Sequence, residues 1–489
     1  KKDKTMANAT YEFMDKFWDT SVLPTLRKYI EIPCKSVAFD PEWEKNGHID
    51  RAMELIREWC EAQNLYEMSL EIHRAPGRTP LMMIKIPGQS MHSILLYGHM
   101  DKQPEMSGWR EGLEPWKAVM EDGRLYGRGG ADDGYAVFAA ISAIKALQEQ
   151  MLPHPQCTIL IEASEESGSC DLPFYMEQLK DDIPTPDLVI CLDSGAGNYD
   201  QLWATTSLRG VVNGVLSVEV LTEGVHSGAA SGIVPSSFRI IRQLLSRIED
   251  ENTGKVLLDS LYVDIPQTRI EEAKQVAEAL GDEVWRHFPW AGNAKPADLP
   301  GYEWILNRSW RPAISYTGIG DMPAIKDAGN VLRPKTSLML SLRIPPLLDH
   351  HVASSALKKA LEADPPYGAK VSFDVQSVAD GWNAPVATSW LLEMANKASE
   401  THYGRPVMYW GEGGSIPFMY LLGEEFPRAQ FLVTGVLGPH ANAHGPNEFL
   451  DIAMAKKLSC CVADILNHFF MMAHSPHTSA LLKSPRRGS

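Results

Sequence analysis

The sequence has no long apolar run, few cysteines and no excess of positive charge. A membrane-spanning helix needs about 18 or more consecutive apolar residues, and the 489 residues contain no such run. The seven cysteines show no paired spacing, which argues against a disulfide framework and favours reduced thiols in a cytoplasm. The formal net charge of −16 argues against nucleic acid as a partner. We therefore expect a cytoplasmic protein without membrane or nucleic-acid contacts, while a processed N-terminus remains an alternative.

What the sequence does have is a series of apolar runs that end in histidine or acid. Run 94–97 leads into His99 and Asp101, run 158–161 leads into Glu165 and Glu166, and run 188–192 leads into Asp193. Asp132 closes a Gly-rich loop before an apolar helix at 136–147, and His444 lies in a loop far downstream. Strands that alternate with helices predict an α/β fold with a mostly parallel sheet covered by helices. Ligands bind at the carboxyl edge of such sheets.

These side chains suit a pair of metal ions. Two histidines and several carboxylates favour zinc, with manganese or cobalt as possible replacements. Two ions about 3.5–4 Å apart can activate water and polarise a carbonyl. Asp101 is two residues from His99, so in extended backbone both point the same way, and a carboxylate commonly orients a metal-binding histidine. Of Glu165 and Glu166, one can hold metal while the other faces the water as general base.

One ligand has a rival within the same loop. His440 precedes His444 by four residues. We prefer His444 because it directly precedes the Gly-Pro-Asn-Glu stretch before the last predicted helix, 452–469. Taken singly, any of these polar residues could be an ordinary surface or turn residue, and only their repeated place at strand ends favours a site.

The pattern of elements changes after residue 208. From there to about residue 383 the order strand-helix-strand-strand-helix-strand is typical of a ferredoxin-like fold, interrupted by a Trp- and Pro-rich stretch, 255–312, without an interpretable motif. We therefore predict a catalytic domain in two parts, 1–208 and 384–489, with a lid or dimerisation domain, 209–383, inserted between them. The polar, basic tail 475–489 is predicted to be disordered.

Together the motifs resemble a di-zinc peptidase family that contains carnosine dipeptidases, glutamate carboxypeptidase, aminoacylase and acetylornithine deacetylase. The stretches that carry the resemblance are Tyr-Gly-His-Met-Asp at 97–101, Leu-Tyr-Gly-Arg-Gly at 125–129 with Asp132-Asp133, Glu-Glu-Ser-Gly at 165–168, Asp-Ser at 193–194, Val-His-Ser-Gly at 225–228 and Gly-Glu-Gly-Gly-Ser-Ile-Pro at 411–417. Asp-Lys-Gln-Pro at 101–104 and Gly108-Trp109 look most like the carnosinase-type branch.

The resemblance implies a role for each matching residue. It implies two divalent ions per chain, one held by His99 and Asp193, the other by Glu166 and His444, with Asp132 bridging both. It further implies Glu165 as general base, Asp101 as the residue that orients His99, His226 acting on the scissile carbonyl across a homodimer, and a site for the substrate carboxylate at Arg343, Gly413, Gly414 and Ser415. Arginine suits that task because its planar fork matches a carboxylate. One departure is Gly134-Tyr135 where the family usually has Lys-Gly.

We therefore expect a metal-dependent dipeptidase or carboxypeptidase. It would hydrolyse dipeptides or short peptides with a free carboxylate by a metal-bridged hydroxide and a Glu base. The alternatives are an N-acyl amino acid deacylase, which would use the same site, and an inactive homologue that only binds. The intact Glu165 argues against the second alternative and also against a metal-storage protein, which needs no base.

Overall fold

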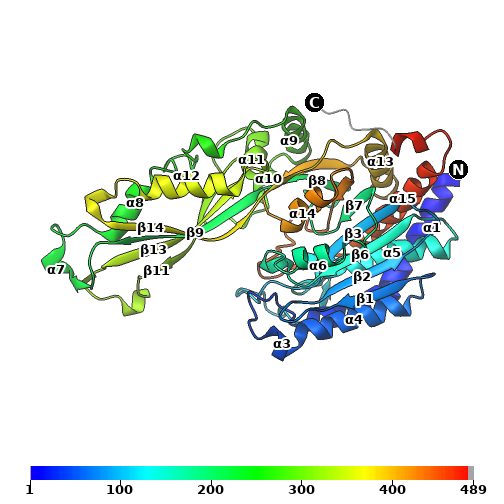
Figure 1. Ribbon diagram of the computed structural model, residues 1–489, viewed down its shortest axis with the longest axis horizontal. Helices are drawn as coiled ribbons and strands as arrows, with labels where there is room; N and C mark the ends of the chain where they lie inside the picture. The colour runs from blue at the N-terminus through cyan, green and yellow to red at the C-terminus, as the bar shows by residue number, and fades with distance from the viewer. Residues whose placement is uncertain (1, 483–489) are drawn as a thin grey trace.

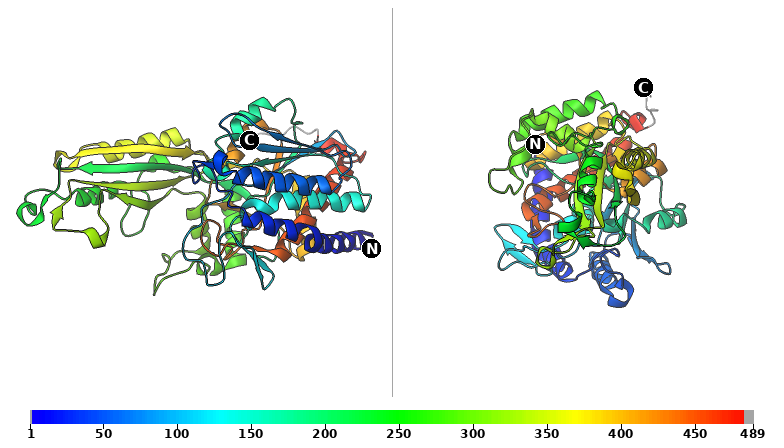
Figure 2. Two further views of the ribbon diagram at one scale, coloured as in Figure 1. Left: turned by 90° about the horizontal axis from the view of Figure 1, so that it is seen from below. Right: turned by 90° about the vertical axis from the view of Figure 1, so that its left-hand side faces the viewer.

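The computed structural model, which describes residues 2–482, has an elongated shape built around two main sheets. A nine-stranded sheet forms the larger body, and a four-stranded sheet projects from it (Figure 1). Figure 2 shows the same projection from a second side and end-on. Among the described residues, no helix has both the length and the apolar character needed to cross a membrane.

The large sheet is parallel in its centre and antiparallel at its edges. Its order is β1-β2-β6-β3-β7-β17-β8-β15, with β16 also paired to β8. The pairs β6–β3, β3–β7, β7–β17 and β16–β8 are parallel, whereas β1–β2, β2–β6, β17–β8 and β15–β8 are antiparallel. Their bounds are β1 Ser69–His73, β2 Leu81–Ile86, β3 Ser93–His99, β6 Gln156–Glu162, β7 Leu188–Cys191, β8 Trp203–Leu208, β15 Trp382–Asn383, β16 Met408–Glu412 and β17 Gln430–Val433. The predicted α/β class is confirmed, and the carboxyl ends of the parallel strands meet at one edge.

Helices cover both faces of this sheet because successive residues of its strands point to opposite faces and are apolar on each face. In β3, Ile94 and Leu96 enter one core, and Leu95 and Tyr97 enter the other. The first core is completed by α1 Lys2–Phe17, η1 Trp18–Val22, α2 Leu23–Glu31, α4 His48–Ala62, α5 Tyr135–Glu149, α13 Ser389–Tyr403 and α15 Ile452–Ala473. The second is completed by α6 Leu172–Gln178 and α14 Pro417–Glu425. Such double cover is the usual setting of central parallel strands.

The four-stranded sheet has the ferredoxin-like arrangement expected for an inserted domain. Its order is β11-β13-β9-β14, and all of its pairs are antiparallel. The elements follow one another as β9 Gly210–Glu219, α8 Ser237–Leu245, β11 Ala313–Gly320, β13 Lys335–Ile344, α12 His350–Glu362 and β14 Lys370–Ala379. Buried residues of α8 and α12 pack on this sheet in a core separate from the other two.

The segment 267–310 between α8 and β11 packs with the larger body, whereas Val256 and Leu261 before it belong to the core of the four-stranded sheet. It forms α9 Gln267–Leu280, α10 Glu283–Arg286 and α11 Gly301–Ser309, and the first and last of these lie against β16. Val276, Ile305 and Trp310 belong to the first core of the large sheet. The sequence placed all of 209–383 in the inserted domain, and for this segment that assignment needs correction. Its apolar helix faces are buried on the large sheet, and the helical pattern alone could not show which sheet they cover.

Shorter elements complete the described chain. They are α3 Trp43–Asn46, β4 Val119–Glu121, β5 Arg124–Tyr126, η2 Gly130–Gly134, η3 Glu165–Ser167, β10 Val225–His226, α7 Ser227–Ala230, η4 Asp259–Leu261, η5 Ile325–Asp327, β12 Val331–Leu332, η6 Pro366–Gly368, β18 Phe449–Asp451 and η7 Ser479–Leu482. The 3-10 helix η7 is an ordered turn within the tail that the sequence predicts to be disordered. The rest of that tail, 483–489, lies outside the described residues.

Candidate metal centre and active site

His99 ends β3 at the carboxyl edge of the sheet and is almost fully buried. Its Nδ1 lies 3.0 Å from the main-chain oxygen of Asp101 and 3.3 Å from that residue's carboxylate. The same carboxylate accepts hydrogen bonds from the backbone N–H groups of Glu165 and Glu166, at 3.1 and 2.9 Å. Asp101 therefore fixes the imidazole ring and also the start of the turn that carries the glutamate pair.

Asp132 lies between two histidines. Its Oδ1 is 3.3 Å from Nε2 of His99, and its Oδ2 is 3.0 Å from Nε2 of His444. Because each carboxylate oxygen faces a different imidazole, the residue can serve two positive centres at once. His440 lines the same pocket, but it is His444 that contacts Asp132.

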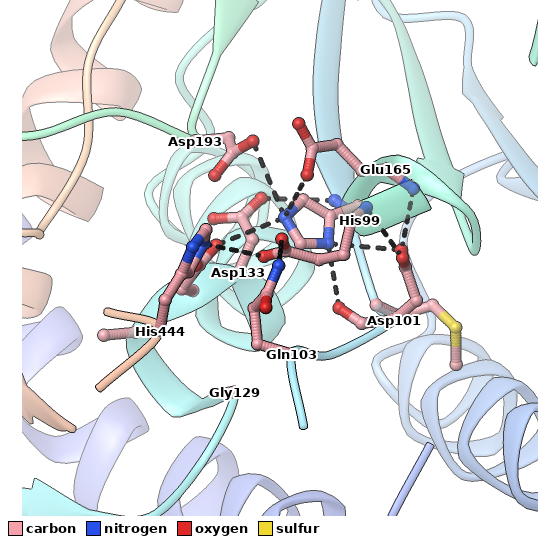
Figure 3. A network of polar contacts seen from close by, with 12 residues as sticks. His99, Asp101, Gln103, Gly129, Asp133, Glu165, Asp193 and His444 are labelled. Carbon is pink, nitrogen blue, oxygen red and sulfur yellow. Dashed lines mark hydrogen bonds and ion pairs between the residues drawn. The ribbon is translucent and has the colours of Figure 1, made fainter. Parts of the chain in front are cut away.

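Two overlapping groups of potential ligands meet at Asp132. One contains His99, Asp132 and Asp193, the other Asp132, Glu166 and His444, and within each group the ligand atoms lie within 4.8 Å of one another. Asp193 Oδ2 is 3.5 Å from His99, and Glu166 Oε1 is 3.3 Å from His444. Figure 3 shows Asp193 and Glu165 directed toward the ring of His99, with His444 at the other side of the same cluster. All five ligands expected from the sequence are thus brought together.

The donor set fits divalent cations. Within residues 2–482, His99 Nε2 and Glu166 Oε1 are buried and lie near oppositely charged groups, but neither atom forms a hydrogen bond of good geometry. Buried polar atoms without a partner are rare in folded proteins. Neutral imidazole nitrogen and carboxylate oxygen are ligands that zinc and similar ions accept. Cations at the two groups of ligands would satisfy both of these atoms.

The charges of the centre also call for cations. Burial raises the pKa of Glu166 to about 7 and of Asp193 to about 6. Burial and the nearby Asp193 raise the pKa of Glu165 well above its usual range. Burial would lower the pKa of His444, but the adjacent carboxylates of Asp132 and Glu166 raise it to about 11. A bound divalent ion would favour the ionised carboxylates and the neutral histidines.

Glu165 lies beside both groups of ligands. Its Oε2 is 3.6 Å from Nε2 of His99, and its side chain lines the pocket. It extends from the 3-10 turn η3, which places the neighbouring Glu166 toward His444. The two adjacent side chains thus contact different histidines, yet one oxygen of each and a ring nitrogen of His99 lie within 4.8 Å of one another, so Glu165 is also within reach of a metal held by its neighbours.

A buried ion pair joins the loop of Asp132 to the loop of His444. The carboxylate of Glu448 accepts hydrogen bonds from Nη1 of Arg128 at 2.9 Å and from the backbone N–H groups of Gly129, Ala131 and Asp132. Arg128 also donates to the main-chain oxygen of Gly445 at 2.7 Å. Sequence reasoning assigned no role to this pair, although both residues stand within the motifs that it quoted.

Two further side chains contact the ligands directly. Gln103 donates from Nε2 to Glu166 Oε2, and Asp133 Oδ2 accepts the backbone N–H of His99 at 3.2 Å. Neither role was predicted, because a glutamine in a loop and the second acid of an acid pair carry no distinctive signal. Both contacts restrict how the predicted ligands can turn.

The structure also accounts for Gly134, the departure within the Asp132 loop. A Cβ at this position would lie 2.1 Å from Cε1 of Tyr29 and 2.7 Å from the main-chain oxygen of Gly129. Tyr29 is itself held by a 2.7 Å hydrogen bond to Met100 O. Any larger residue at position 134 would therefore collide with the aromatic ring packed beneath the loop.

A pocket of about 900 Å³ opens over the centre. It is lined by the large sheet's loops, by Arg343 of β13 and by residues of α10 and α11. Arg343 Nη1 donates to Ser415 Oγ at 3.1 Å, and Gly414 and Ser415 line the same wall. Gly413 instead packs behind this wall, where its main-chain oxygen accepts a hydrogen bond from Arg209. The predicted carboxylate site is therefore assembled at one side of the pocket.

His226 is the predicted residue that the chain does not bring to the centre. It is exposed, and among the described residues it is not part of the pocket lining. The helix α7, which begins at the next residue, lies at the outer end of the four-stranded sheet, far from the large sheet (Figure 1).

Comparisons with known proteins agree with this fold. A model of the family described as Peptidase family M20/M25/M40 matches residues 95–468. The cysteinylglycine-S-conjugate dipeptidase of Corynebacterium striatum is 26% identical over 439 residues, which cover 86% of this chain and 90% of the relative. The Beta-Ala-His dipeptidase of Rattus norvegicus is 26% identical over 340 residues, or 66% of each chain.

Solved structures show the same architecture. The di-peptidase Dug1p from Saccharomyces cerevisiae superposes with a TM-score of 0.78 at 21% identity, covering 96% of this chain and 99% of its own. Human carnosine dipeptidase 1 gives a TM-score of 0.74 at 20% identity, with 94% and 99% covered. At these identities the likeness concerns the fold alone.

Proposed function

The chain belongs to peptidase family M20/M25/M40, and from this premise we propose that it is a metal-dependent dipeptidase. The observation that carries the proposal is Asp132, which turns one carboxylate oxygen to each of two histidines while Glu165 lies alongside. The relatives reported above are named as dipeptidases, which favours dipeptides over N-acyl amino acids as substrates.

The proposed centre holds two divalent ions, with zinc as the first candidate. His99, Asp193 and one oxygen of Asp132 would hold one ion, and Glu166, His444 and the other oxygen would hold the second. Bound there, the pair of ions would lower the pKa of water and polarise the scissile carbonyl. Asp101 keeps Nδ1 of His99 engaged, which leaves Nε2 for the metal.

The remaining steps belong to side chains of this protein. Glu165 takes the proton from the attacking water and delivers it to the amine that leaves, as a general base and then acid. Arg343 and the Gly414-Ser415 wall hold the free carboxylate of the substrate, so that the scissile bond lies over the centre. This positioning raises the rate because the scissile bond and the attacking water are already held in a fixed geometry and need not meet by a bimolecular encounter.

We further propose a homodimer in which each inserted domain supplies His226 to the other subunit's centre. The distance of α7 from its own large sheet supports this arrangement. A two-fold contact between identical sheets or helices would bring each His226 across the dimer. All seven cysteines are free, and six of them are buried, which is compatible with the reducing, cytoplasmic setting expected from the sequence.

A substrate panel tests the proposed function. Amine release would be measured for free dipeptides, for the same dipeptides amidated at the C-terminus and for N-acyl amino acids, each with and without added zinc or manganese. We expect metal-dependent cleavage of the free dipeptides and loss of most turnover on amidation. Equal rates on acid and amide would contradict the carboxylate site, and preference for N-acyl amino acids would identify a deacylase.

A further inference from the structure

Arg308 extends from α11, and among residues 2–482 its guanidinium has no hydrogen-bond acceptor. It lines the pocket, and its Nε is fully buried without a partner among residues 2–482. Its Cζ lies 4.5 Å from the ring centroid of Trp410, so the planar group rests on an aromatic face. A buried donor without an acceptor costs free energy, which indicates that an acceptor outside the described protein completes this site.

Among the described residues, no neighbouring charged group forms a hydrogen bond or a close ion pair with Arg308. Glu412 is near enough to influence Arg308, but its Oε1 accepts the backbone N–H of Gly195 at 3.0 Å. Arg209 donates to the main-chain oxygens of Gly413, Asn307 and Arg311. Arg308 thus differs from Arg209 in that its guanidinium makes no hydrogen bond to the main chain among the described residues, and its side chain lines the pocket.

The surroundings of Arg308 suit a carboxylate in particular. The five donors of a guanidinium lie in one plane and match the two oxygens of a carboxylate. Arg343, the proposed site for the terminal carboxylate, enters from β13 of the inserted domain, whereas Arg308 enters from α11 on the other body. Gly413 lies against the stem of Arg308, since a Cβ there would meet its Cγ at 3.0 Å. The pocket is therefore equipped with two separate cations for anionic groups.

We propose that Arg308 binds a second carboxylate of the substrate, so that the enzyme prefers dipeptides with an acidic side chain. This inference rests on the proposed dipeptidase function. The carboxylate can belong to the residue on either side of the scissile bond, and a pocket of about 900 Å³ has room for such a side chain.

The test compares substrates that differ only in charge. Values of kcat/KM would be measured for Ala-Glu against Ala-Gln and for Glu-Ala against Gln-Ala. We expect the acid to be preferred in one pair by about 10- to 100-fold, the range for a charge-assisted hydrogen bond. Arg308→Met keeps much of the contact with Trp410 and should abolish the preference, mainly through KM, while the amide substrates are still cleaved. Arg308→Lys should restore part of the preference for the acidic substrate.

Arg286→Met serves as the control. Arg286 belongs to α10, pairs with Asp282 at the surface and is not part of the pocket lining in the described chain. Equal rates on acid and amide in the unaltered enzyme, or a preference that survives Arg308→Met, would overturn the proposal. So would an equal loss on acids and amides, because it would reveal a purely structural role.

A binding experiment separates this proposal from the function on which it rests. Glutamate and glutamine would be titrated calorimetrically into the metal-loaded enzyme and its Arg308→Met variant. If no dipeptide is cleaved, the dipeptidase function fails, and the titration alone decides the role of Arg308. Tighter binding of glutamate that is lost in the variant supports the proposal, and equal binding of both amino acids overturns it.

Discussion

At the scale of single residues, the centre depends on how Asp132 is kept ionised. Burial would raise the pKa of this carboxyl, but the adjacent His444 and His99 lower it well below the usual range. Asp132 therefore carries its charge at neutral pH even before any cation arrives. The loop can thus present a ready anionic bridge to incoming metal, while its acidic neighbours have raised pKa values.

Replacing Asp132 should remove metal from both positions. We expect Asp132→Ala to lower the metal content of purified protein from about two ions per chain to below one, because both proposed sites lose a shared ligand. Elemental analysis after dialysis checks this. Asp122→Ala, an exposed turn residue, is the control and should retain the metal. A metal-free but fully active Asp132→Ala enzyme would contradict the proposed centre.

The adjacent glutamates should respond differently to the same substitution. Glu165→Gln should keep metal and substrate binding but lose about 10²–10⁴ in kcat, the usual contribution of a general base. Glu166→Gln should lose metal, since Glu166 Oε1 faces His444 and has no other partner among the described residues. Metal content and kcat would be measured on both variants. The opposite pattern would show that the two roles are reversed.

At the scale of elements, the centre is built from loops that a single ion pair holds together. Arg128 and Glu448 are fully buried and bind three separate stretches, the 129–132 loop, the 445 loop and, through Pro104 O at 3.0 Å, the loop after β3. Buried ion pairs of this kind are expensive to form and strongly destabilising when one partner is removed. Their position here suggests that they orient the ligands of both proposed ions.

Arg128→Met should therefore weaken the metal site as well as the fold. We expect about 3–5 kcal/mol lower free energy of unfolding and about 10- to 100-fold weaker metal binding, the effect typical of groups that orient ligands. Urea unfolding and competition with a chelator measure the two quantities. The exposed pair Arg110–Glu121 provides the control, because Arg110→Met should cost at most about 1 kcal/mol. Unchanged metal affinity in Arg128→Met would restrict the pair to a role in folding.

Which parts of the fold and centre were predictable depends on how local their signals are. His99, Glu165 and Asp193 follow apolar strands directly, so a few neighbouring residues reveal them. Glu448 was not identifiable, because it meets Arg128 across 320 positions. Likewise, α9 and α11 have an ordinary helical pattern, which cannot tell which of two sheets they cover. The antiparallel edges of the large sheet were missed for the same reason, since strand direction is fixed by distant pairings.

At the scale of the whole molecule, the proposed homodimer makes two incomplete centres into complete ones. His226 lies next to α7, at the far end of the inserted domain, while the ligands and Glu165 belong to the large sheet. A chain that acts alone would need its inserted domain to fold back over most of its length. Sharing between subunits requires no such movement.

Mixing two inactive variants tests this arrangement. His226→Ala and Glu165→Gln chains should each have little activity, but mixed dimers contain one centre with both residues intact. We expect partial recovery of kcat, up to about a quarter of the unaltered activity for random pairing. Subunit exchange would be verified independently with differently tagged chains. Background activity despite exchange would show that His226 acts within its own chain or not at all.

The position of β17 has a consequence for how the chain is made. This strand pairs with β7 and β8 in the middle of the large sheet, yet it is built from residues 430–433. During synthesis, β7 and β8 therefore leave the ribosome more than 200 residues before the strand that joins them. Until then the nascent chain presents open strand edges, which are prone to wrong pairing. A chain that ends before residue 430 would thus lack the strand that joins β7 to β8. We expect efficient folding to require that the edges of these two strands are protected until β17 is made.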